Sequence, residues 1–138
     1  MTRQAPATPQ PPLLFRALAD RTRLRIVNLL AQGTLCVCDI QRILGQPQSS
    51  VSRHLALLKS ADLIRDRRDG MRTFYALTDW SAPLARGVLN TIRAHLAAEG
   101  QYLADIAEVS DMRRRGTCHV PPKSWPRPGA PKARRGAD

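Results

Sequence analysis

The sequence has few aromatic residues and no long hydrophobic stretch. Phe, Trp and Tyr make up 4% of its 138 residues, so most apolar side chains available for a core are Leu, Ala, Ile and Val, which favours a largely helical protein. No apolar run is long enough for a transmembrane helix, so we expect no membrane contact. Residues 1–12 have no hydrophobic signal core, so we expect a cytoplasmic protein.

Cysteine is also scarce. There are three, an odd number that fits no secreted disulfide framework, so we expect free thiols in a reducing compartment, available for metal or redox chemistry. Enzyme motifs are missing as well: the sequence has no phosphate-binding loop, no activated nucleophile with a base nearby and no cofactor fingerprint. We therefore expect no enzyme and no organic cofactor.

Positive charge, in contrast, is abundant. The formal net charge is +11, which suggests a polyanionic partner such as a nucleic acid. Most of the excess lies late in the chain, where eight Lys/Arg residues and one acid follow from Arg113 onward. The case for DNA therefore has to rest on residues 13–112, which we expect to form one folded domain between a disordered, Pro-rich segment (1–12) and a basic, Pro-rich tail (113–138).

Apolar spacing and breaker residues predict a mainly α domain with one small β-hairpin. Helices are expected over residues 13–19, 21–30 (capped by Asp20), 34–44, 47–60 and 81–109, the last with a break possible at Gly100. In the segment 47–60, Val51, Leu55 and Leu58 line one face and Ser49, Ser52, Arg53 and Ala56 the other. Asp69-Gly70 between two β-capable runs predicts the hairpin.

Two helices and then a basic hairpin are the order of a winged helix-turn-helix. A small, polar helix face can enter the major groove closely, and Arg53 on it can reach a guanine edge or a phosphate. The hairpin arginines can follow the DNA backbone: Arg65, Arg67, Arg68 and Arg72. The plainer interpretation is a helical domain with a solvated basic hairpin.

The stretches "LADRTRLRIVNLL", "LCVCDI", "SSVSRHLALLKSADLI" and "RRDGMRTFYAL" resemble the ArsR/SmtB family of metal- and metalloid-responsive repressors. The resemblance implies a homodimer paired through its terminal helices, which binds operator DNA until an inducer ion releases it. It also implies DNA-binding residues in a recognition helix and a wing. His54 can equally be a residue satisfied by packing. The implied set is Gln48, Ser49, Ser50, Ser52, Arg53, His54, Arg67, Arg68 and Arg72.

Cys36 and Cys38 stand at the start of the predicted helix 34–44, with Cys36 near its cap position. In a regular helix, residues two apart point about 200° away from each other, so both thiolates cannot hold one ion. Either the first turn is irregular, or ion binding unwinds it and so disturbs the DNA-reading unit. The plainer interpretation is that both are small buried hydrophobes.

"LCVCD" resembles the signature of the arsenite- and antimonite-sensing branch, which implies As(III), or Sb(III), as inducer. That branch has a third cysteine where this chain has Gln41, so we expect Cys118 to supply the third sulfur. Open alternatives are a cadmium- or lead-responsive repressor, an organoarsenical-responsive one and a thiol redox sensor. A zinc pair at His95 and Glu99 is a weaker option, and His119 is interpreted as an incidental residue of the tail.

Overall fold

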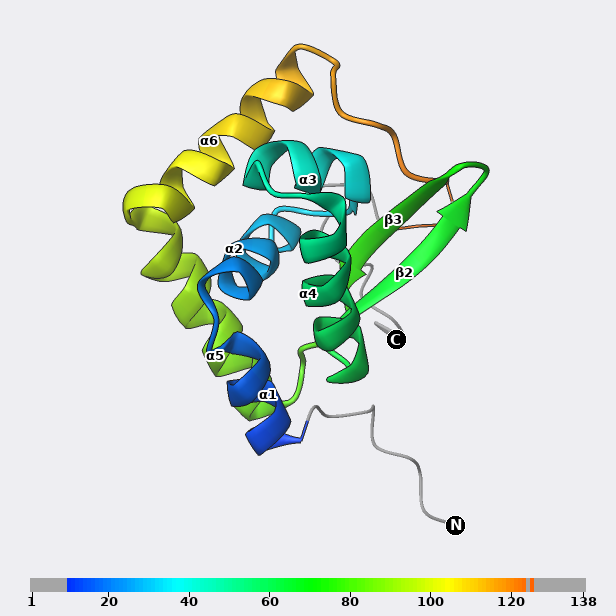
Figure 1. Cartoon of the computed structure of the whole chain (residues 1–138). Helices are drawn as coiled ribbons and strands as arrows, with labels where there is room; N and C mark the ends of the chain where they lie inside the picture. The colour runs from blue at the N-terminus through cyan, green and yellow to red at the C-terminus, as the bar shows by residue number, and fades with distance from the viewer. Residues whose placement is uncertain (1–9, 124, 126–138) are drawn as a thin grey trace, which may run out of the picture.

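The computed structural model describes residues 10–123 and residue 125 (Figure 1). Helices α1 to α4 come first along the chain, a hairpin follows, and two further helices end the described part. In order, the elements are α1 (Pro11–Leu18), α2 (Arg21–Leu30), β1 (Leu35–Cys36), α3 (Val37–Leu44), α4 (Gln48–Ser60), β2 (Ile64–Asp69), β3 (Arg72–Leu77), α5 (Pro83–Ala94), the 3₁₀ turn η1 (Leu96–Ala98) and α6 (Gly100–Arg114). This is the mainly α fold with a small antiparallel sheet that the sequence predicts.

The junction between α1 and α2 follows from its capping chemistry. Asp20 has an extended backbone, and its carboxylate accepts a hydrogen bond from the backbone N–H of Arg23 at 3.0 Å, as predicted. The Arg23 side chain then donates to the Ala17 carbonyl at 2.6 Å, which fixes the end of α1 against the start of α2. Helix α1 begins two residues earlier than expected, because Pro11 and Pro12 suit a first helical turn, where no N–H is needed.

Helices α3 and α4 form the helix-turn-helix. Gly45 ends α3 in the left-handed conformation (φ +64°), and its N–H donates to the Gln41 carbonyl at 2.9 Å. In the turn, the Gln46 amide donates to the Thr22 hydroxyl at 3.0 Å and accepts from the Ser50 hydroxyl at 3.3 Å. The apolar face of α4 is buried as predicted, through Val51, Leu55 and Leu58.

The sheet has three antiparallel strands in the order β1-β3-β2. Strands β2 and β3 form the predicted hairpin, from the pair Ile64–Leu77 to the pair Asp69–Arg72, so Gly70 and Met71 make its two-residue loop. The prediction of a helix over 34–44 was wrong at its first residues. Leu35 and Cys36 pair with Tyr75 and Phe74 of β3, because a buried apolar pair beside an open strand edge gains more from sheet pairing than from one helical turn.

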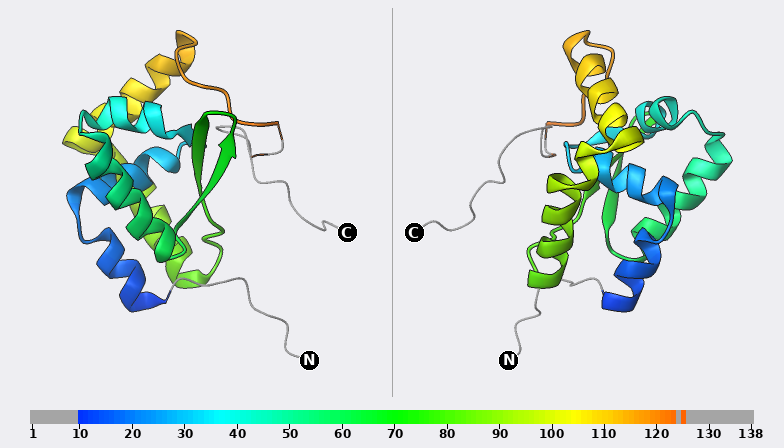
Figure 2. Two further views of the ribbon diagram at one scale, coloured as in Figure 1. Left: turned by 45° about the vertical axis from the view of Figure 1, so that its right-hand side comes forward. Right: turned by 90° about the vertical axis from the view of Figure 1, so that its left-hand side faces the viewer.

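The expected helix over 81–109 is divided into α5 and α6 by η1, and α6 continues to Arg114. In both views of Figure 2, α6 lies beside α3, at the opposite end of the molecule from α1. The buried carboxylate of Asp105 fixes α6 to α2, because it accepts from both Nε and Nη2 of Arg25, at 2.8 and 2.9 Å. Within the described residues, we find no helix long and apolar enough to cross a membrane.

Candidate functional site

The exposed face of α4 is polar. Gln48, Ser49, Ser52 and Arg53 are exposed on it, whereas Ser50 is half-buried and bonded to Gln46 in the turn. Gln48 opens the helix, so this end presents short polar side chains and one guanidinium to solvent. The face has the composition of a helix that can lie close to base edges and phosphates.

His54 occupies a different position from its neighbours on α4. Its Nδ1 lies 3.4 Å from Nη1 of Arg23 and 3.7 Å from a carboxylate oxygen of Asp20. The ring is therefore held at the contact between α2 and α4 and is half-buried there. The packing role left open by the sequence agrees with this geometry, and a direct contact of His54 with DNA stays a prediction.

The hairpin presents four exposed arginines: Arg65, Arg67, Arg68 and Arg72. Its one inward acid, Asp66, binds the Lys59 ammonium of α4 at 3.0 Å, which connects the hairpin to the recognition helix. The Arg65 guanidinium lies over the ring of Trp125, 5.3 Å from its centroid, a cation–π contact with the segment that follows α6. The other three arginines are in the positions that a DNA-binding wing requires.

The two cysteines at the start of the helix-turn-helix face each other. Cys36 is the N-cap residue of α3 with an extended backbone (φ −70°, ψ 145°), and Cys38 lies in the first helical turn. Because Cys36 is outside the helix, the 200° separation of a regular helix does not apply, and the two Sγ atoms are 2.6 Å apart. Of the alternatives left open by the sequence, the structure supports the irregular start.

His119 joins this pair, and its interpretation as an incidental tail residue was wrong. Its Nδ1 lies 3.1 Å from Sγ of Cys38 and 3.2 Å from both carboxylate oxygens of Asp39, and its backbone N–H donates to Asp39 at 2.9 Å. Ligand atoms of Cys36, Cys38 and His119 all lie within 4.8 Å of one another. The neighbouring Cys118 was the only sequence signal that this segment approaches the pair.

Cys118 is half-buried and packs against the hydrophobic core. In the described part of the chain it is outside the group formed by Cys36, Cys38 and His119, so its role as a third sulfur ligand stays a prediction. Burial raises the pKa of the Cys118 thiol; burial and the hydrogen bond with Cys36 raise the pKa of Cys38 to about 12. Both thiols therefore keep their protons in the free protein, and a bound ion has to displace them.

The zinc pair suggested for His95 and Glu99 lacks the geometry it needs. His95 precedes η1 and Glu99 follows it, so the two do not share one helix face at i, i+4. Both residues are exposed.

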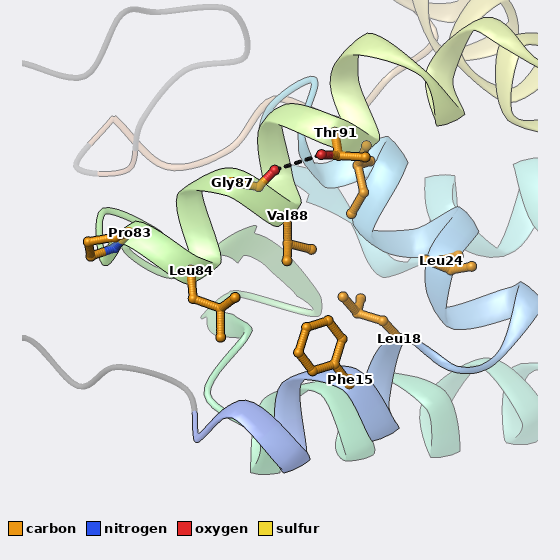
Figure 3. Close-up of a pocket in the computed structure, with 9 residues that line it drawn as sticks. Phe15, Leu18, Leu24, Pro83, Leu84, Gly87, Val88 and Thr91 are labelled. Carbon is orange, nitrogen blue, oxygen red and sulfur yellow. Dashed lines mark hydrogen bonds between the residues drawn. The ribbon is translucent and has the colours of Figure 1, made fainter.

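An apolar groove of about 540 Å³ lies between α1 and α5 (Figure 3). Phe15 and Leu84 point into it and are 52% and 44% exposed, which is unusual for side chains of this size. Such an open apolar face is typical of a surface that another molecule covers. The lining residues are Phe15, Leu18, Leu24, Pro83, Leu84, Gly87, Val88, Thr91 and Ile92.

Comparison with known proteins agrees with this architecture. Residues 20–66 match the family model described as bacterial regulatory protein, arsR family. The chain is 37% identical over 103 residues to the arsenic resistance transcriptional regulator ArsR1 of Pseudomonas putida, which covers 71% of this chain and 80% of that protein. It is 47% identical over 76 residues to the arsenical resistance operon repressor of Escherichia coli K12, covering 51% of this chain and 65% of that protein.

A solved structure supports the same assignment. The homodimeric winged helix-turn-helix DNA-binding domain Mb0332 of Mycobacterium bovis superposes with a TM-score of 0.53 at 34% identity, over 64% of this chain and 82% of that one. The exposed helix α4, the basic hairpin and these relatives lead to one conclusion. The chain belongs to the ArsR family and is a winged helix-turn-helix transcriptional repressor.

Proposed function

We propose that the chain binds operator DNA as a homodimer and that As(III), or Sb(III), releases it by binding Cys36 and Cys38. The observation that carries the proposal is the position of the cysteine pair. Cys36 is at once the N-cap of α3 and a strand residue paired with β3, so it joins the helix-turn-helix to the hairpin. A change in the spacing of the two sulfurs therefore acts on both DNA-reading elements.

For DNA, we assign base contacts to the exposed end of α4 and backbone contacts to the hairpin. Arg53 is the residue best suited to a guanine edge, and the short side chains around it allow close approach. Ser50 and His54 remain in the proposed set at the edge of the surface, because both are half-buried. The wing contribution comes from Arg67, Arg68 and Arg72.

For the dimer, we assign the apolar groove between α1 and α5 to a second copy of the chain. Exposed Phe15 and Leu84 supply the apolar area that such an interface buries. The M. bovis relative is described as homodimeric, and two-fold symmetry would place two copies of α4 against two operator half-sites.

For the inducer, the donor chemistry fits a soft centre. Two sulfurs lie on one side of the chain, and thiolates select soft ions over hard ones. The ion supplies a trivalent thiophilic centre; Cys36 and Cys38 hold it, and Cys118 completes a three-sulfur set after its segment turns. Because the released state must bind the ion better than the DNA-bound state does, this coupling is a difference in affinity between two conformations.

All three cysteines are free in the structure, which suits a reducing cytoplasm, and we assign the chain no catalytic activity. Isothermal titration of the reduced protein tests the inducer assignment. We expect arsenite to bind one site per chain, and to bind far more weakly when Cys36 and Cys38 are both serine. Tight cadmium binding with no response to arsenite would replace the arsenic assignment.

A further inference from the structure

The segment after α6 is directed by the way the helix ends. Gly116 takes the left-handed conformation (φ +69°), its N–H donates to the Arg113 carbonyl at 3.1 Å, and the N–H of Thr117 donates to Met112 at 2.9 Å. These two bonds are the Schellman closure of a helix, which turns the chain sharply. In Figure 1 the chain then runs from the end of α6 toward the hairpin, and it carries His119 past the cysteine pair.

Asp39 holds His119 at that place. Its buried carboxylate accepts the backbone N–H of His119 at 2.9 Å and lies 3.2 Å from the ring Nδ1. A buried carboxylate needs such partners, so Asp39 ties the segment to the first turn of α3. Trp125, further along, stacks on Arg65 of the wing. The position of His119 is therefore fixed from both sides.

From this geometry we propose that Cys36, Cys38 and His119 form a binding site for a borderline divalent cation of the Zn²⁺ class, with Asp39 as the positioning residue. It concerns the same cysteine pair as the proposed function, but it needs neither DNA binding nor arsenic. Thiolates suit Zn²⁺ and soft ions, imidazole suits Zn²⁺ and its neighbours, and zinc is common to both preferences. Two thiolates also balance the charge of a divalent ion, which a buried site requires.

The spacing of the donors is close to what such an ion takes. With Zn–S bonds of about 2.3 Å and a Zn–N bond of about 2.0 Å, tetrahedral geometry separates sulfur from sulfur by about 3.8 Å and sulfur from nitrogen by about 3.6 Å. The corresponding distances here are 2.6 Å between Cys36 and Cys38, and 3.1 Å between Cys38 and His119. Outward movements on the order of 1 Å complete the site, and a fourth position stays open to water.

Co²⁺ is the spectroscopic probe for this site, because thiolate ligation gives charge-transfer bands and tetrahedral geometry gives strong visible bands. We expect the reduced full-length protein to bind one Co²⁺ per chain with both signatures, and Zn²⁺ to displace it. His119→Ala should lower the Zn²⁺ affinity by at least roughly tenfold and weaken the visible bands. The matched control, His95→Ala, removes an exposed histidine of the same chain and should leave both unchanged.

Two further variants separate ligation from folding. Asp39→Ala should lower the affinity by roughly tenfold to a hundredfold while the shape of the Co²⁺ spectrum stays that of wild type, because Asp39 only orients the ligand. His119→Cys should restore tight binding with stronger charge-transfer bands. X-ray absorption of the Zn²⁺-loaded wild type needs no variant, and we expect two sulfurs together with the outer-shell scattering of an imidazole.

The inference is overturned if the wild type binds no Co²⁺, if His119→Ala binds it as wild type does, or if the zinc spectrum shows no imidazole. These results are independent of the proposed function. A protein that releases operator DNA with arsenite, but whose zinc site lacks His119, keeps the function and loses the inference. A protein that binds Zn²⁺ through Cys36, Cys38 and His119, but does not respond to arsenite, does the opposite.

Discussion

Cys36 faces Phe74 across the antiparallel pair of strands β1 and β3. Phe74 is buried and belongs to the hairpin, whereas Cys36 also begins α3, so one residue connects the cysteine pair, the helix-turn-helix and the wing. An ion that draws the sulfurs of Cys36 and Cys38 into its own geometry moves the end of a strand and the start of a helix together. This arrangement gives the proposed release of DNA a physical path that needs no long-range relay.

The first prediction concerns DNA recognition. Arg53→Ala should weaken operator binding by about 1–3 kcal/mol, the size of one good base contact, with a much smaller effect on unrelated DNA. Arg68→Ala is the matched control on the wing, and it should weaken binding to any sequence and reduce the salt dependence. Fluorescence anisotropy at several salt concentrations measures both. Wild-type operator affinity in the two variants would show that these faces do not contact DNA.

The second prediction concerns the dimer. Phe15→Glu places a charge in the apolar groove between α1 and α5, so we expect it to shift the protein toward monomers in analytical ultracentrifugation. Met71→Glu is the control, because Met71 is 95% exposed at the hairpin loop and lies outside the groove. If Phe15→Glu sediments as wild type does, the dimer uses another face.

The third prediction concerns the attachment of α6. Asp105 is 1% exposed and receives two bonds from Arg25, so Asp105→Ala leaves a partly buried guanidinium without its anion. We expect a loss of about 3 kcal/mol in the free energy of unfolding, measured in urea at a fixed protein concentration. Asp111→Ala removes an exposed ion-pair partner of the same helix and should cost less than about 1 kcal/mol. Equal losses would argue against a special role for the buried pair.

Sequence patterns predicted the helix-turn-helix and the hairpin because their signals are local. Asp20 caps α2, Gly45 ends α3 and Gly70 opens the hairpin loop, each through the backbone preference of one residue. The pairing of Cys36 with β3 was missed, since it depends on a strand that lies far along the chain. The same reason hid His119: its approach to Cys38 spans 81 positions, and no periodicity reports a contact of that kind.

The fourth prediction concerns Cys118. If its segment turns to supply a third sulfur, Cys118→Ser should weaken the response to inorganic arsenite and spare methylated As(III), which needs only two sulfurs. X-ray absorption on the arsenite-loaded protein counts the ligands. Two sulfurs in both the wild type and Cys118→Ser would remove Cys118 from the site.

The most direct test of the account is release of operator DNA by arsenite, followed by fluorescence anisotropy with reduced protein. Wild type should bind the operator and leave it as arsenite is added. Cys36→Ser and Cys38→Ser should bind the operator like wild type, because their DNA contacts lie elsewhere and serine at position 36 can cap α3. Neither variant should be released at the arsenite concentration that frees the wild type. Release of both variants at that concentration, or a wild type that stays bound, would contradict the assignment of the cysteine pair as the sensor.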